Sequence, residues 1–172
     1  MLGLSSSDAF DAFYEQGATK LASQIYAFMG DANEALDVVQ EAYIRAWTRW
    51  PRVSQLDDPQ AWVRRIAFNL AKNATRRRRK FSSFPAPQQV VDADPSDRQR
   101  LELGAAMAVL SAEHRQALVL HYLGGLTYAE IAVEMSVPVG TVKSWLSRAR
   151  SHLATALAGL EAHDDDERRW GA

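Results

Sequence analysis

The stretch that decides the fold runs from Leu126 to Leu153 and reads LTYAEIAVEMSVPVGTVKSWLSRARSHL. Thr127 and Glu130 form the T-x-x-E pattern of a capping box, which predicts that a helix begins directly after Thr127. Pro138 ends this helix, because a proline disfavours the helical conformation for the residue before it. A second helix is expected from about Val139. Two short helices joined by a tight turn are typical of a helix-turn-helix.

The second helix has one apolar and one polar face. We expect its buried face to consist of Val139, Val142, Leu146, Ala149 and Leu153. The opposite face carries Lys143, Ser144, Ser147 and Arg148. Donors of these types on an exposed helix suit the base edges and phosphates of a DNA major groove. An ordinary amphipathic helix pair with a solvated basic face also fits this stretch alone, and DNA binding is the favoured interpretation.

The composition excludes several other classes of protein. Hydrophobic residues make up 47% of the 172, yet no apolar run approaches the roughly 20 residues that span a bilayer, so no direct membrane insertion is expected. The N-terminus lacks the basic and apolar segments of a secretory signal. The absence of cysteine excludes disulfides, thiolate catalysis and cysteine zinc sites, and it fits a cytoplasmic protein.

Nothing in the sequence indicates a catalytic, metal or cofactor site. The four histidines are scattered and show no metal-ligand spacing with carboxylates. No serine–histidine–aspartate set and no glycine-rich phosphate loop is visible. We therefore expect a protein that is not an enzyme, with no catalytic residues, no metal and no cofactor.

The basic residues are concentrated in two segments, although the net charge is only −1. Residues 1–80 carry 12 basic and 9 acidic residues, whereas residues 101–172 carry 6 and 9. Pro59–Lys80 contains eight basic residues and no acidic one, and Val139–His152 contains three and none. One basic segment in each half of the chain predicts two separate contacts with a polyanion.

The hydrophobic periodicity predicts an all-α chain with two small helical domains. The first spans residues 1–80 and the second residues 98–160, with helices expected over 101–109 and 112–123 before the helix-turn-helix. Residues 81–97, FSSFPAPQQVVDADPSD, contain three prolines and no period, which indicates a linker. The charged tail, residues 161–172, is expected to be frayed.

In the first domain an amphipathic helix is expected up to about Met29, and a second from Asn33 to about Trp50. The apolar stripe expected on the second helix is Leu36, Val39, Tyr43, Ala46, Trp47 and Trp50. Its other face carries Asp37, Gln40, Glu41 and Ile44. An isoleucine framed by polar and acidic residues indicates either a protein-docking face or a solvated face with one stray apolar residue, and the pattern leaves both open.

A third helix begins at Pro59, with Asp58 as its N-cap. Its expected core positions are Trp62, Val63, Ile66, Ala67 and Leu70. Its outer face carries Arg65, Asn69, Lys72, Asn73 and Arg76, interleaved with the aromatic rings of Trp62 and Phe68. Cations, amides and aromatic rings together suit unstacked nucleic-acid bases, although both aromatic residues could equally be core residues. For the run RRRRK, a polyanion contact is favoured over a solvated helix end.

Three motifs, in this order, resemble the bacterial sigma-70 family, specifically its small extracytoplasmic function (ECF) group. They are ALDVVQEAYIRAW (35–47), PQAWVRRIAFNLAKNATRRRRK (59–80) and LTYAEIAVEMSVPVGTVKSWLSRAR (126–150). Within the group the chain is similar to the actinobacterial SigE-like members. The resemblance implies a factor that binds core RNA polymerase, through the β′ clamp helices and the β flap, and that directs it to promoters and helps to melt the DNA. It also implies an anti-sigma partner.

The resemblance also implies roles for individual residues. The polymerase-docking residues would be Asp37, Gln40, Glu41 and Ile44. The residues that contact the minus-ten element would be Trp62, Arg65, Asn69, Lys72, Asn73, Arg76 and Arg77, with Asn69 holding a flipped-out base. The residues that read the minus-thirty-five element would be Thr141, Lys143, Ser144, Ser147 and Arg148.

Trp145 departs from the family, whose members usually carry a basic residue there; we expect it to pack at the edge of the domain rather than stack on a sugar.

Two other functions remain open at this point. A conventional helix-turn-helix regulator would bind duplex DNA without polymerase. A protein-interaction module that mimics a sigma factor would bind polymerase without melting DNA.

Overall fold

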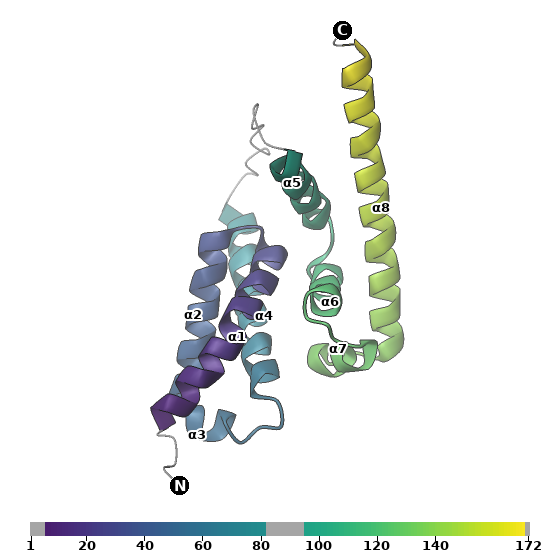
Figure 1. Cartoon of the computed structure of the whole chain (residues 1–172). Coiled ribbons are helices and arrows are strands. Elements are labelled where there is room, and N and C mark those ends of the chain that lie inside the picture. The colour runs from purple at the N-terminus through teal and green to yellow at the C-terminus, as the bar shows by residue number, and fades with distance from the viewer. Residues whose placement is uncertain (1–5, 82–94, 171–172) are drawn as a thin grey trace. The chain divides into compact units, whose positions relative to one another are not determined.

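A computed structural model describes residues 6–81 and 95–170 of the chain, with side chains described for residues 6–78 and 102–158. Every regular element in the described residues is an α-helix. The helices form two compact units, Met1–Ser82 and Ser83–Ala172, here called unit 1 and unit 2 (Figure 1). The predicted all-α fold class is therefore confirmed. Most of the predicted linker lies outside the described residues.

Over its described residues, unit 1 contains four helices, which are α1 (Ser6–Met29), α2 (Ala32–Thr48), α3 (Trp50–Val53) and α4 (Pro59–Phe81). Gly30 ends α1 in a left-handed conformation with φ +76°, which glycine adopts without steric cost. Asp31 then caps α2, because its Oδ1 accepts a hydrogen bond from the Glu34 backbone N–H at 2.9 Å. Asp58 caps α4 in the same way through the Ala61 N–H at 2.9 Å, which confirms the predicted start of that helix.

The core of unit 1 lies where α1, α2 and α4 pack on one another (Figure 1). Phe28 of α1 and Phe68 of α4 meet edge to face, with ring centroids 5.4 Å apart, and both are fully buried. Of the two roles that the sequence left open for Phe68, the structure therefore supports the core role. Its ring lies on the same side of α4 as the fully buried Val63 and Ala67, so the apolar face of α4 is wider than its charged sequence suggests.

The prediction of the apolar stripe on α2 was wrong in part. Leu36 and Trp47 are 52% and 46% exposed, and Trp50 begins the separate helix α3. The buried stripe of α2 consists of Ala35, Val38, Val39, Ala42, Tyr43 and Ala46. Three of these residues are alanines, and the larger side chains of Leu36 and Trp47 lie outside this stripe and face solvent.

Unit 2 contains α5 (Pro95–Ala108), α6 (Ala112–Tyr122), α7 (Tyr128–Met135) and α8 (Val139–Trp170). The predicted capping box is present, since the Thr127 N–H donates to Glu130 Oε2 at 2.7 Å and the Glu130 N–H donates to Thr127 Oγ1 at 3.3 Å. Ser136 ends α7 in the left-handed conformation, with φ +56°. The tight turn from α7 to α8 therefore includes a left-handed residue that is not glycine.

Two helix boundaries in unit 2 differ from the prediction. Helix α5 begins at Pro95, inside the expected linker, because proline is well suited to the first position of a helix. Helix α8 continues to Trp170, beyond the domain end predicted at residue 160 and through most of the charged tail. Its second half contains no proline and many good helix formers, so nothing in the sequence stops the helix.

Candidate nucleic-acid interface

Helix α8 presents a polar face because its opposite face is fixed in the core of unit 2. Val142, Leu146 and Ala149 are fully buried, and they pack α8 against the other helices of the unit. The predicted major-groove residues lie on the other side, where Lys143, Ser147 and Arg148 are exposed and Thr141 and Ser144 half-buried. Val139 was expected in the buried face and is 39% exposed, because it is the first residue of the helix.

Trp145 lies at the edge of this polar face, against a residue that the sequence did not single out. Its indole ring is half-buried and meets the His114 ring of α6 edge to face, with centroids 6.2 Å apart. This placement agrees with the expected edge packing. Partial burial, and then the nearby Arg148 guanidinium, lower the pKa of His114 below its usual range, which favours the neutral form of the ring. No local sequence signal connects His114 with α8; only the packing of α6 against α8 brings them together.

Helix α4 carries the second group of predicted DNA-binding residues. Arg65, Asn69, Asn73 and Arg77 follow one another at intervals of four, so they form a single exposed stripe along the helix. The remaining members of the set are Arg76, which is exposed, and Trp62 and Lys72, which are half-buried. The stripe places two amide side chains between cationic ends, so it can donate to phosphates and form paired hydrogen bonds with base edges.

The predicted docking residues lie on the outer side of α2. Asp37, Gln40 and Ile44 are exposed, and the Ile44 side chain is 58% accessible to solvent. Glu41 is half-buried and pairs with Arg45, whose Nε lies 2.7 Å from Glu41 Oε1. The four residues therefore share one surface, in which an apolar side chain stands among polar and acidic groups.

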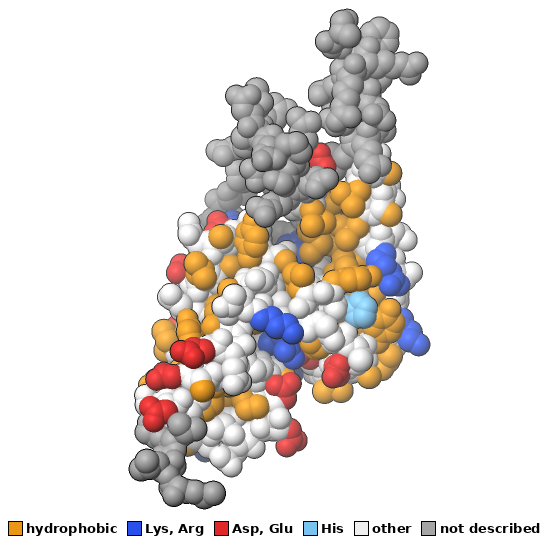
Figure 2. Space-filling model, in the orientation of Figure 1, with side chains coloured by type: hydrophobic (Ala, Val, Ile, Leu, Met, Phe, Trp, Pro, Cys, Tyr) orange, Lys and Arg blue, Asp and Glu red, His pale blue; other side chains and the backbone are white. Residues whose placement is uncertain are grey.

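A pocket of about 390 Å³ between α1 and α2 extends this surface. Its lining residues are Ser7, Phe10, Asp11, Tyr14, Gln40, Tyr43, Ile44 and Trp47. Tyr14 is 41% exposed at this pocket, and Trp47, which was expected in the apolar stripe of α2, is 46% exposed. Red acidic and orange apolar side chains lie together over the first turns of α1, at the lower left of Figure 2.

The described residues show no group of three His, Asp or Glu side chains that could hold a metal ion. None of the helices searched there is both long and apolar enough to cross a membrane. The surfaces that the structure presents are a polar helix face in each unit and a mixed acidic and apolar face on α1 and α2. These surfaces suit binding to macromolecules.

Comparisons with known proteins match both units. Residues 13–81 match the family model "Sigma-70 region 2", and residues 100–153 match "Sigma-70, region 4". The RNA polymerase sigma-H factor of Pseudomonas aeruginosa is 34% identical over 169 residues, which cover 88% of each chain. The ECF RNA polymerase sigma factor SigL of Mycobacterium tuberculosis is 33% identical over 158 residues, covering 87% of this chain and 89% of SigL.

The fold resembles a solved sigma factor. The sigma factor RpoE of Bartonella quintana, crystallised with the anti-sigma factor NepR, superposes with a TM-score of 0.69. The match covers 87% of this chain and 97% of that one, at 24% sequence identity. At this identity the likeness concerns the fold.

Proposed function

This chain belongs to the sigma-70 family of RNA polymerase sigma factors, and to the ECF group within it, and from this premise we propose how its three surfaces act. It functions as a sigma factor that binds core RNA polymerase and directs it to promoters. We propose that it does so in the cytoplasm as a non-catalytic initiation factor. The polymerase supplies the chemistry and this chain supplies recognition of the DNA.

The observation that carries the proposal is the presence of two polar faces of different chemistry on two separate units. The face on α8 offers hydroxyl and cationic donors from a helix whose other side is fully buried, which suits a duplex major groove. The stripe on α4 offers amides between arginines, which suits bases that have left the stack. A conventional duplex-binding regulator has no use for the second face.

On α4, Asn69 is proposed to hold a flipped base of the minus-ten element. An asparagine can form two hydrogen bonds with the edge of a base, and its position in the middle of the stripe leaves cations on both sides for the phosphates. Arg65, Lys72, Arg76 and Arg77 would contact those phosphates, with Asn73 beside them. Trp62, half-buried at the start of the helix, would lie at the edge of the melted segment.

On α8, Lys143 and Arg148 are proposed to contact the minus-thirty-five element directly, together with the hydroxyl groups of Thr141, Ser144 and Ser147. If the two faces neutralise about six to eight phosphates, the logarithm of promoter affinity should fall with the logarithm of salt at about −0.9 per contact. Promoter binding that hardly changes with salt would contradict this assignment.

The α2 face, made by Asp37, Gln40, Glu41 and Ile44, is proposed to dock on the β′ clamp helices, while unit 2 reaches the β flap. An anti-sigma protein is proposed to cover the same α2 face when the factor is inactive. The exposed Tyr14, Ile44 and Trp47 support this proposal, because an apolar surface of this kind gains from being covered. A pull-down from native cells that returned polymerase subunits and nothing else would count against the anti-sigma partner.

Run-off transcription with purified core polymerase and a genomic promoter library, with and without this protein, tests the proposal. New start sites that depend on the protein and are preceded by two short elements are expected. Tight duplex binding without polymerase, and without new start sites, would instead indicate a conventional regulator. Polymerase binding without new start sites would indicate a sigma mimic.

A further inference from the structure

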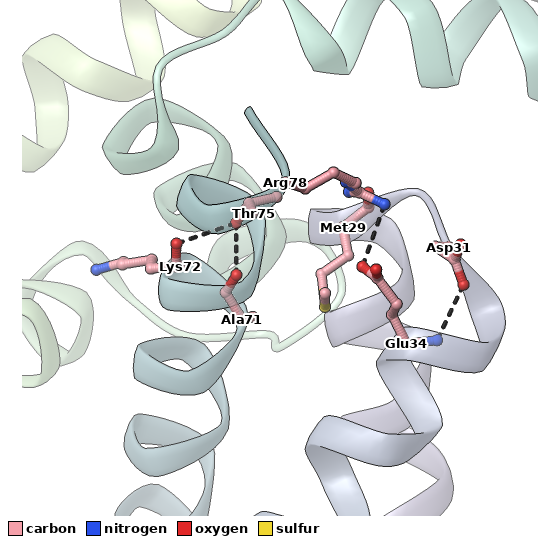
Figure 3. A network of polar contacts seen from close by, with 7 residues as sticks. All are labelled: Met29, Asp31, Glu34, Ala71, Lys72, Thr75 and Arg78. Carbon is pink, nitrogen blue, oxygen red and sulfur yellow. Dashed lines mark hydrogen bonds and ion pairs between the residues drawn. The ribbon is translucent and has the colours of Figure 1, made fainter. Parts of the chain in front are cut away.

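One arginine of the basic run at the end of α4 points away from the DNA-binding stripe. Arg76 and Arg77 are exposed, whereas Arg78 is half-buried and reaches back to the junction of α1 and α2. Its Nη1 lies 3.1 Å from Glu34 Oε2, and its Nη2 donates to the Met29 carbonyl at 3.1 Å (Figure 3). The run of four arginines therefore contains residues with different structural roles.

Both partners of Arg78 lie at helix ends, one a backbone carbonyl of α1 and the other a carboxylate of α2. Met29 is the last residue of α1, so its carbonyl belongs to the last turn, whose carbonyls have no partner inside the helix. Glu34 lies in the first turn of α2 and is fixed there by the Asp31 cap. A planar guanidinium can serve both acceptors at once with its two terminal nitrogens, which a lysine ammonium cannot do with the same geometry.

Figure 3 shows that Lys72 and Arg78 leave α4 on opposite sides. Thr75, between them, turns its hydroxyl back to the Ala71 carbonyl of the helix itself. The described part of this helix end thus has one side from which the half-buried Lys72 extends and another side that is tied to the rest of unit 1.

We propose that Arg78 is a positioning residue, which holds the basic end of α4 against the α1–α2 junction so that Arg76 and Arg77 face the promoter phosphates. The inference rests on the proposed function. It adds that the pair Glu34–Arg78 links the DNA-binding helix α4 to α2, the helix whose residues 37–44 dock on polymerase. Docking of α2 on the polymerase would thereby also fix the position of the α4 cations Arg76 and Arg77.

The charge on Glu34 makes the proposal testable, because the two possible roles of Arg78 predict opposite effects. If Arg78 itself bound phosphate, Glu34→Gln would remove a competing anion and promoter binding would tighten or stay the same. If Arg78 positions the helix end, Glu34→Gln weakens promoter binding by holoenzyme about 2- to 5-fold, the range of an exposed ion pair. Arg78→Gln, which also loses the Met29 contact, should weaken it more.

The experiment measures holoenzyme binding to the promoter identified by run-off transcription, for Glu34→Gln, Arg78→Gln and the double variant. We expect the double variant to bind no more weakly than Arg78→Gln alone, because both changes remove the same interaction. Promoter binding by Arg78→Lys should lie between that of the unmodified protein and that of Arg78→Gln. Tighter or unchanged binding by Glu34→Gln, or additive losses in the double variant, would overturn the proposal.

Arg77→Gln is the matched control, since Arg77 is the exposed neighbour in the same run. It should reduce the salt slope of promoter binding by about 0.7, the value of one phosphate contact on a single strand. If Arg77→Gln leaves the salt slope unchanged, the contact between α4 and phosphate in the proposed function is wrong, whatever the result for Glu34→Gln.

A second measurement on the free protein needs no promoter. Amide hydrogen exchange over residues 76–81 should be faster in Glu34→Gln and Arg78→Gln than in Arg77→Gln, because only the first two release the helix end. Equal exchange in all three variants would show that the pair does not hold this end of α4, and it would overturn the positioning role even if the sigma assignment stands.

Discussion

The side-chain amide of Gln60 lies directly over Gly17, so close that a Cβ atom on residue 17 would overlap it. Gln60 is held there by two hydrogen bonds. Its Nε2 donates to the Phe13 carbonyl of α1 at 2.9 Å, and its Oε1 accepts from the Tyr43 hydroxyl of α2 at 3.1 Å. One residue of α4 therefore joins all three large helices of unit 1, and glycine at position 17 makes the space for it.

Gly17→Ala should destabilise unit 1, although alanine is the better helix former. The new methyl group must displace the Gln60 amide and break its two hydrogen bonds, at a cost of about 1–3 kcal/mol. Gly104→Ala in α5 is the control, because a Cβ there meets nothing within 4 Å. It should stabilise its helix by about 0.5–1 kcal/mol. Urea unfolding of both variants measures the difference, and a stabilising Gly17→Ala would show that Gln60 moves aside freely.

Burial makes the contribution of Tyr43 to the stability of unit 1 depend on pH. Burial, opposed by the Gln60 hydrogen bond, raises the pKa of Tyr43 to about 12 from its ordinary value of 10.0. The neutral phenol is thus favoured in the folded state, and its contribution to stability is complete below pH 10 and is lost as the pH rises towards 12. Absorbance titration should show one tyrosine that ionises near pH 12. Tyr43→Phe should remove this phenolate and flatten the decline of the melting temperature over the same window.

The helix starts could be predicted because their signals are local. Asp58 and the pair Thr127–Glu130 each act within four residues, and both cap helices in the structure. Helix faces were harder to predict from a periodic pattern. On α2 the buried stripe passes through alanines, and the bulky Leu36 and Trp47 remain outside, which depends on how closely α1 and α4 approach.

The contacts that position the candidate site could not be predicted, because they join residues distant in sequence. Gln60 binds a carbonyl 47 positions earlier, and Arg78 binds one 49 positions earlier. The residue types carry no signal for either contact: a glutamine in the first turn of α4 and an arginine among four arginines look like surface residues. The same holds for His114, which only the packing of α6 on α8 places beside Trp145.

The two DNA-binding faces should be separable by mutation. Asn69→Ala removes a base contact and should weaken holoenzyme binding to a minus-ten element about 5- to 150-fold, the range of a bidentate base contact, with little change in salt slope. Lys143→Ala should weaken binding to duplex carrying the minus-thirty-five element and reduce the slope by about 0.9. Thr155→Ala, exposed further along α8, is the control. If Asn69→Ala and Lys143→Ala impaired binding to the same DNA fragment, the assignment of the two promoter elements to separate units would be wrong.

The docking face of α2 can be tested against an exposed leucine on the same helix. Ile44 and Leu36 are similarly exposed, at 58% and 52%, but only Ile44 lines the pocket between α1 and α2 and belongs to the proposed docking set. Ile44→Glu should weaken binding to core polymerase by at least about 10-fold, the loss expected when a central apolar contact is removed. Leu36→Glu should change it by less than about 2-fold. Both variants should unfold within about 0.5 kcal/mol of the unmodified chain, because neither side chain is buried. Equal losses of polymerase binding in the two variants would mean that the whole outer side of α2, rather than the surface around Ile44, contacts the polymerase.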